Sequence, residues 1–151
     1  MESAWMGHAL REATLALEHD DVPVGAVVVQ ISTGEIVAGA HNTRERDHDP
    51  TAHAEMLALR AAAQSAGTWR LTDHALVVTL EPCPMCAGAA WAARVARVVF
   101  GAADPKAGSA GSLYNFAADP RLNHEIEVVR GIRAQECGDL LTEFFRSRRS
   151  S

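Results

Sequence analysis

The chain has 151 residues, 48% of them hydrophobic and 22% charged, and a formal net charge of −5. No apolar run approaches the ~20 residues that a membrane-spanning helix needs, and residues 1–17 lack the basic start and unbroken apolar stretch of a signal peptide. Three cysteines in a chain without an export signal argue against a disulfide framework. We therefore expect one cytoplasmic domain over residues 1–151 with no membrane partner.

The first third of the chain predicts a helix followed by a β-hairpin. Apolar residues recur at helical spacing over residues 3–19, which is typical of an amphipathic helix. Residues 22–29 are almost wholly apolar and rich in valine, as expected for a strand buried on both faces. A turn at residues 32–34 leads into a second strand over residues 35–40, and a polar loop follows over residues 41–50.

The rest of the chain predicts three helices and three strands. The predicted helices cover residues 52–66, 85–93 and 134–148, and the predicted strands cover residues 75–80, 95–100 and 126–129. Residues 101–111 form a predicted loop of small residues. Strand–helix–strand order implies parallel pairs with helices on the sheet faces. We expect an α/β fold, a three-layer α/β/α sandwich around a mixed, mostly parallel five-stranded sheet.

Two short segments contain the residue types of a metal site. They are Thr51-Ala52-His53-Ala54-Glu55 and Glu81-Pro82-Cys83-Pro84-Met85-Cys86, and each stands where a loop enters a predicted helix. Zinc favours thiolate and imidazole ligands in a tetrahedron. Cys83 and Cys86 are one helical turn apart, so both sulfurs face one side, where the helix N-terminus stabilises thiolates. His53 supplies a third ligand from the other segment.

Three protein ligands leave one position open, which is typical of a catalytic zinc rather than a structural one. Glu55 follows His53 by two residues, and a carboxylate there can take a proton from water and return it to a leaving amine. Two other interpretations stay open from the residues alone. The cysteine pair could be a redox motif, which leaves His53 and Glu55 unexplained. A structural zinc could instead be completed by Cys137, His41, His48 or His124.

The pattern His-x-Glu followed by Pro-Cys-x-x-Cys is the signature of zinc nucleobase deaminases. The chain resembles one branch of the cytidine deaminase-like superfamily, the bacterial tRNA-specific adenosine deaminases, from about residue 4 to residue 149. The matching stretches are residues 22–27, 41–42, 49–55, 79–88, 98–101, 111–113, 123–124 and 144–146. The downstream loop and the Phe-Phe-Arg ending are more specific to the tRNA branch than the two metal segments are.

The resemblance implies a cytidine deaminase-like fold, a homodimer, one Zn²⁺ per subunit and a tRNA anticodon stem-loop as partner. The reaction implied is hydrolytic deamination of the wobble adenosine to inosine. The residues implied are His53, Cys83 and Cys86 as zinc ligands, Glu55 as proton shuttle, Asn42 and the Ala54 backbone N–H as contacts of the flipped base, and Asp104, Lys106 and Phe145 as lining of the anticodon-loop channel.

Several assignments have alternatives. Asp104 could accept a hydrogen bond from a ribose 2′-hydroxyl, which separates RNA from DNA, or it could simply cap its loop. Arg146, Arg148 and Arg149 could form a phosphate-binding patch in this acidic chain or a solvated helix end. A deaminase of free guanine or cytidine would use the same zinc site. A zinc-stabilised RNA-binding module without catalysis would have no use for Glu55.

Overall fold

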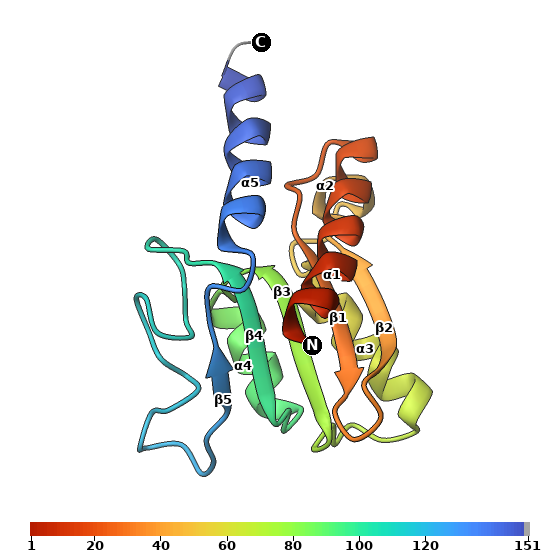
Figure 1. Cartoon of the computed structure of the whole chain (residues 1–151), viewed down its shortest axis with the longest axis vertical. Coiled ribbons are helices and arrows are strands. Elements are labelled where there is room, and N and C mark those ends of the chain that lie inside the picture. The colour runs from red at the N-terminus through yellow and green to blue at the C-terminus, as the bar shows by residue number, and fades with distance from the viewer. Residues whose placement is uncertain (150–151) are drawn as a thin grey trace.

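The centre of the computed structural model is a single five-stranded sheet (Figure 1). The structure describes residues 1–149, with Arg149 described by its backbone alone, and Ser150 and Ser151 lie outside the described residues. The strands are β1 (Gly25–Gln30), β2 (Glu35–His41), β3 (His74–Leu80), β4 (Arg97–Ala102) and β5 (Glu127–Val129), and they lie in the order β2-β1-β3-β4-β5.

The sheet is mixed, with β1 antiparallel to both β2 and β3, and with β3, β4 and β5 mutually parallel. The predicted mixed five-stranded sheet is confirmed, but only half of its pairings are parallel, fewer than expected. The reason lies in the hairpin. The strand–helix–strand connection does make β2 and β3 run in the same direction, yet β1 lies between them and pairs antiparallel with each.

Helices cover both faces of this sheet, as the predicted three-layer sandwich requires (Figure 1). The helices of residues 1–149 are α1 (Glu2–Ala16), continued by a short 3₁₀ turn (Leu17–His19), then α2 (Arg44–Asp47), α3 (Ala54–Ala66), α4 (Pro84–Ala92) and α5 (Ala134–Arg149). Helices α1 and α5 pack on one face, and α3 and α4 pack on the other. None of these helices is both long and apolar enough to cross a bilayer.

Alternate residues of β1 supply both layers of the core, because successive side chains of a strand point to opposite faces. Val27 and Val29 pack in the layer that contains Trp5 of α1. Val28 packs in the opposite layer, which contains Phe100 and residues of α3 and α4. The prediction that this strand is buried on both faces is confirmed.

The structure departs locally from the predicted elements at two places: one has a tertiary cause, and at the other the Val24 N–H donates to the Val22 carbonyl at 2.8 Å in a turn across Pro23. The predicted polar loop contains the short helix α2, whose Glu45 and Arg46 N–H groups donate to the buried carboxylate of Asp21 at 2.8 and 3.2 Å. Strand β1 begins at Gly25 rather than at residue 22. A side chain at Gly25 would overlap the Ala9 carbonyl, so α1 packs directly on the strand backbone there.

Candidate active site

The two predicted metal segments meet at one end of the sheet, each at the start of a helix. His53 is the N-cap residue of α3, and Cys83 is the N-cap residue of α4. Pro84 occupies the first turn of α4, where its missing N–H leaves no helical hydrogen bond unmade. Cys86 lies in the same turn and is fully buried. The positive ends of two helix dipoles therefore face the cluster, which favours thiolate over thiol.

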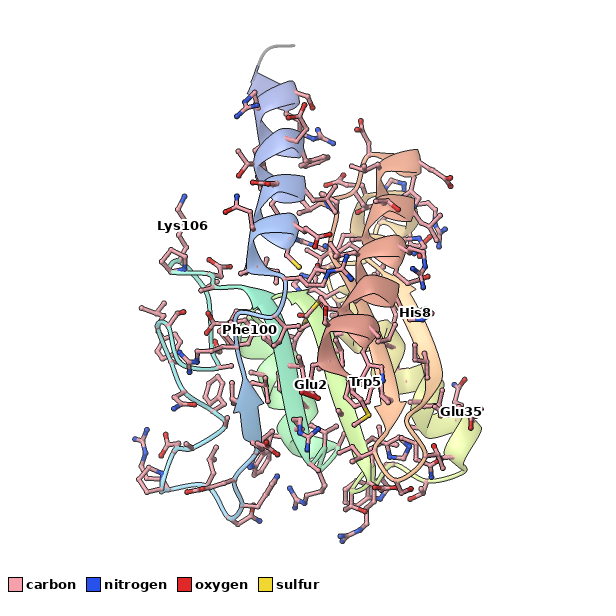
Figure 2. The ribbon with its side chains drawn as sticks, viewed as in Figure 1. Glu2, Trp5, His8, Glu35, Phe100 and Lys106 are labelled. Carbon is pink, nitrogen blue, oxygen red and sulfur yellow. The ribbon has the colours of Figure 1, made fainter. Side chains whose placement is uncertain are left out.

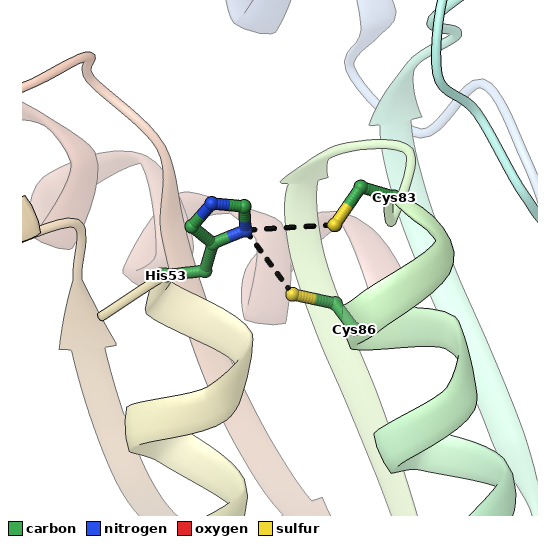
Figure 3. A group of neighbouring side chains, drawn as sticks. All are labelled: His53, Cys83 and Cys86. Carbon is green, nitrogen blue, oxygen red and sulfur yellow. Dashed lines mark hydrogen bonds between the residues drawn. The ribbon is translucent and has the colours of Figure 1, made fainter. Parts of the chain in front are cut away.

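The three side chains are arranged as the ligands of one metal ion would be. His53 Nδ1 lies 3.6 Å from Cys83 Sγ and 3.3 Å from Cys86 Sγ (Figure 3). Tetrahedral zinc with ordinary Zn–N and Zn–S bond lengths separates nitrogen from sulfur by about 3.6 Å. All three ligand atoms lie within 4.8 Å of one another. The donor set and its spacing thus fit Zn²⁺.

The protonation of the cluster reflects how closely the three groups pack. A hydrogen bond from Cys86 lowers the pKa of the Cys83 thiol to about 4. The same contact raises the pKa of Cys86, and the hydrogen bond to Cys83 raises the pKa of His53. Without metal, Cys83 therefore carries the negative charge while its neighbours hold the protons. Zinc binding needs neutral imidazole and thiolates, so it releases protons from this cluster.

Glu55 lies beside the cluster, in the first turn of α3. Its side chain is only 4% exposed. Burial raises the pKa of this carboxyl to about 7, because removal from water penalises the charged form. A group with a pKa near neutrality can both accept and donate a proton at physiological pH, which is what a general acid–base catalyst requires.

The cluster opens into a cavity of about 200 Å³. Its apolar walls include Val22, Val24 and Leu80, and its polar lining is Asn42, Arg44, His53, Glu55, Glu81, Cys83 and Asp104. Apolar walls with a few convergent polar groups are typical of a site for a small ligand or a single base. The cavity lining contains none of the four residues that could have served as the fourth ligand of a structural zinc, which are His41, His48, His124 and Cys137.

The structure places two of the five predicted substrate residues in the lining of this cavity. Asn42 and Asp104 line it. The Ala54 backbone N–H, which was predicted to contact the base, instead donates to Asn42 Oδ1 at 2.8 Å in this structure. This bond uses the side-chain oxygen of Asn42, so its side-chain NH₂ group is the part of Asn42 that can donate to a ligand. Asp104 Oδ1 accepts the N–H groups of Lys106 and Ala107, so the loop-capping interpretation of this carboxylate is observed directly.

Two predicted channel residues lie outside the cavity lining. Lys106 is exposed and points away from the body of the protein (Figure 2). Phe145, on α5, is 46% exposed and meets Phe144 edge to face. Their predicted contacts with an anticodon loop stay predictions.

Two polar residues of the cavity lining were not among the predicted site residues. Arg44, exposed at the start of α2, belonged to the predicted polar loop, whose residue types hold no signal for a site. Glu81 stands inside the cysteine segment, two residues before Cys83, and that position is the signal for it in the sequence; its burial is visible only in the structure. Burial alone would raise the pKa of Glu81, but hydrogen bonds from Ser112, Asp104 and Ala110 lower it below its ordinary value.

Comparison with known protein families agrees with this site. Residues 1–102 match the family described as the cytidine and deoxycytidylate deaminase zinc-binding region. The chain belongs to this deaminase family. The match includes all three metal-cluster residues and Glu55, so the structural cluster and the family's zinc-binding region are the same part of the chain.

Similar proteins indicate to which branch of the deaminase family the chain is most similar. The chain is 51% identical to the tRNA-specific adenosine deaminase of Bacillus subtilis strain 168, over 98% of this chain and 91% of that protein. It is also 51% identical to part of the tRNA(Ile)-lysidine synthase of Deinococcus radiodurans, over 94% of this chain but 24% of that protein. The resemblance to tRNA-specific adenosine deaminases is confirmed.

Solved structures confirm the deaminase fold. One, from studies of A-to-I editing by tRNA:A34 deaminases at the wobble position of transfer RNA, has a TM-score of 0.87 and 40% identity, covering 92% of this chain and 99% of that one. The guanine deaminase of Nitrosomonas europaea has a TM-score of 0.79 and 26% identity, covering 94% of this chain and 83% of that one. The predicted cytidine deaminase-like fold is therefore confirmed.

Proposed function

We propose that this enzyme converts adenosine to inosine at the wobble position of a tRNA anticodon, with one zinc ion per subunit. The observation that carries the proposal is the His53–Cys83–Cys86 triangle with Glu55 beside it, in a cavity sized for one flipped base. The adenosine and tRNA parts rest on the relatives, of which the Bacillus subtilis protein is 51% identical.

His53, Cys83 and Cys86 would hold zinc, which lowers the pKa of a coordinated water to about 7 and so supplies a nucleophile at neutral pH. Glu55 takes the proton that the water loses. It then delivers protons to the purine ring nitrogen and to the departing amine. Water adds at C6 of adenine and ammonia leaves, so adenosine plus water gives inosine plus ammonia.

The remaining cavity residues would bind and orient the substrate. A base must leave its stack to enter the cavity, which is easiest in a single-stranded loop. The amide of Asn42 would hydrogen-bond the base, next to the Ala54 backbone, and Asp104 would accept a ribose 2′-hydroxyl. Lys106 and Phe145 would contact the anticodon loop outside the cavity. With a tRNA substrate, the protein would act in the cytoplasm.

The homodimer implied by the family is part of the proposal. An apolar groove of about 320 Å³ lies along α3 and α4, lined by Met56, Leu59, Trp69 and neighbouring alanines. Trp69 is 55% exposed there. A large aromatic in an apolar groove is typical of an interface, and a second copy of the chain is the proposed occupant. Trp69→Glu should shift the mass measured by light scattering toward the monomer. An unchanged dimer mass would contradict this placement.

The competing function is deamination of a free base or nucleoside, as in the guanine deaminase of the same fold. Purified, zinc-loaded protein should be incubated with an anticodon stem-loop containing a wobble adenosine, and in parallel with free adenosine, guanine and cytidine. We expect ammonia and inosine from the stem-loop alone. Ammonia from a free base or nucleoside, with the stem-loop unchanged, would keep the zinc chemistry and overturn the tRNA assignment.

A further inference from the structure

A buried carboxylate joins the metal-binding turn to the loop that carries Asp104. Glu81 is 2% exposed and stands two residues before Cys83. Its Oε1 accepts the Asp104 N–H at 3.0 Å and the Ser112 hydroxyl, and its Oε2 accepts the N–H groups of Ala110 and Ser112, each at 3.0 Å. Four donors from one loop therefore converge on a single side chain.

Backbone hydrogen bonds strengthen the same connection. The Glu81 N–H donates to the Ala102 carbonyl at 2.9 Å, and the Ser109 N–H donates to the Pro82 carbonyl at 2.8 Å. Two backbone hydrogen bonds thus attach the loop to Glu81 and Pro82, the residues that lead into Cys83. Because Cys83 is the N-cap of α4, the loop is anchored to the residues that lead into the start of that helix.

The loop approaches the Glu81 carboxylate most closely at Gly108, which leaves no room for a side chain there. A side chain at Gly108 would overlap the Glu81 carboxylate and the Asp104 carbonyl. The Gly108 N–H donates to that Asp104 carbonyl at 2.8 Å, which closes a tight turn around Asp104. The position of Asp104 at the cavity thus depends on the carboxylate behind it.

We propose that Glu81 is a positioning residue for substrate binding, which holds Asp104 against the cavity and so sets the affinity for the RNA substrate. The inference rests on the proposed function, since it concerns the substrate of that site. Glu81 itself moves no proton and holds no metal. Its effect passes through Asp104, so its removal should raise KM while zinc binding and kcat are kept.

The chemistry of the four donors explains why a carboxylate is required. Two carboxylate oxygens can accept all four hydrogen bonds. Glutamine has the same shape but one acceptor oxygen, and its NH₂ group would face N–H donors of the loop. Glu81→Gln should therefore release the loop without leaving a cavity. Ser112→Ala removes only the hydroxyl donor and is the milder variant.

The test is steady-state deamination of the wobble-adenosine stem-loop, with zinc content and thermal midpoint measured on each variant. We expect Glu81→Gln to raise KM by roughly tenfold or more, with kcat changed less than about threefold and zinc at one per chain. In the Asp104→Ala background, Glu81→Gln should add no more than about twofold, because the two residues act as one unit.

Ser32→Ala is the matched control for Ser112→Ala. It removes an exposed serine hydroxyl that also donates to a carboxylate, that of Asp73, outside the cavity lining. Ser112→Ala should raise KM by about two- to fivefold, and Ser32→Ala should stay at the wild-type value. If Glu81→Gln fails to fold, the comparison of these two serine variants still tests the inference.

Equal KM values for Ser112→Ala and Ser32→Ala would overturn the inference. So would a Glu81→Gln variant whose thermal midpoint falls while its KM is unchanged, because that is a purely structural role. A full tenfold effect of Glu81→Gln in the Asp104→Ala background would show that Glu81 does not act through Asp104. A wild-type protein that leaves the stem-loop unchanged would instead reject the proposed function, and the two failures are thereby distinguished.

Discussion

The metal cluster and the loop between β4 and β5 form two sides of one cavity, and they are built in different ways. The cluster stands on helix starts, with His53 and Cys83 as N-cap residues of α3 and α4. The loop has no helix, and the bridge between Ala110 and Asn115 is its one β pairing among the described residues. Side-chain acceptors, above all Glu81, hold its course instead.

This difference in construction suggests a division of roles, in which the helix starts carry out the chemistry and the loop determines substrate selectivity. Groups that share one metal must keep their geometry to within a few tenths of an ångström, and regular elements provide that precision. Substrate contacts vary among deaminases of the same fold, and loops accept such variation without disturbing the sheet. On this account, changes at the helix starts should remove turnover, whereas changes in the loop should alter which substrate is bound.

The largest effect is expected at the metal cluster itself. Cys86→Ala removes a fully buried thiol that we propose as a zinc ligand, so zinc measured by atomic emission should fall well below one per chain and turnover should be lost. The thermal midpoint should fall as well, because metal bound only by the folded state stabilises it. Full zinc retention in this variant would contradict the assignment of Cys86 as a ligand.

Glu55→Ala should separate proton transfer from metal binding. Zinc should stay bound, while kcat falls by roughly 10²- to 10⁴-fold, the usual contribution of a general acid–base group. Glu18→Ala, the same substitution at an exposed position of the 3₁₀ turn, should keep the wild-type rate. Retained turnover in Glu55→Ala would remove this residue from the mechanism.

The thiols of the cluster and of the core should differ in reactivity once the metal is stripped. The pKa of Cys83, lowered to about 4, keeps it a thiolate at pH 6, and this residue is partly exposed. Burial raises the pKa of Cys137 to about 11, so it stays protonated up to pH 9. Iodoacetamide at pH 6 should therefore modify Cys83 at least about 100-fold faster than Cys137. Peptide mass spectrometry would measure both rates, and equal labelling would contradict the electrostatics of the cluster.

The smallest effect is expected in the loop. Asp104→Asn should relax the preference for RNA over DNA by a few-fold, because the amide accepts a ribose 2′-hydroxyl less well than a carboxylate does. Asp119→Asn is the matched control, since Asp119 lies in the same loop and pairs with Arg121 instead. Paired assays on stem-loops with ribose or deoxyribose at the target position would measure the ratio. An unchanged ratio for Asp104→Asn would leave only its loop-capping role.

The contrast between helix starts and loop also explains which parts of the site could be predicted from the sequence. The structure brings His53, Cys83 and Cys86 together with Glu55 in the adjoining cavity, and the residue types and their spacing at helix starts had already pointed to such a donor set. The strands of the core were predicted from apolar runs of suitable length. The two metal segments lie about 30 residues apart, but each carries its own short motif at a helix start, so both can be recognised without knowing the course of the chain between them.

Long-range contacts account for what the sequence did not predict. The position of β1 between β2 and β3 depends on how the hairpin enters the sheet. Helix α2 forms where Asp21, distant in sequence, accepts two of its N–H groups. The donors of Glu81 lie 23 to 31 residues further along the chain, in a loop of small residues with no periodic pattern. A residue held by such contacts is identified only when the loop's course is known.

The central claim, that the helix starts perform the chemistry and the loop side selects a wobble adenosine, is tested most directly by locating inosine in a defined RNA. A stem-loop with adenosines at the wobble position and at several other loop positions would be treated with zinc-loaded protein and sequenced, because inosine is read as guanosine. The account predicts conversion at the wobble adenosine alone. Conversion at every loop adenosine, or no conversion in the RNA together with ammonia release from a free base, would contradict it.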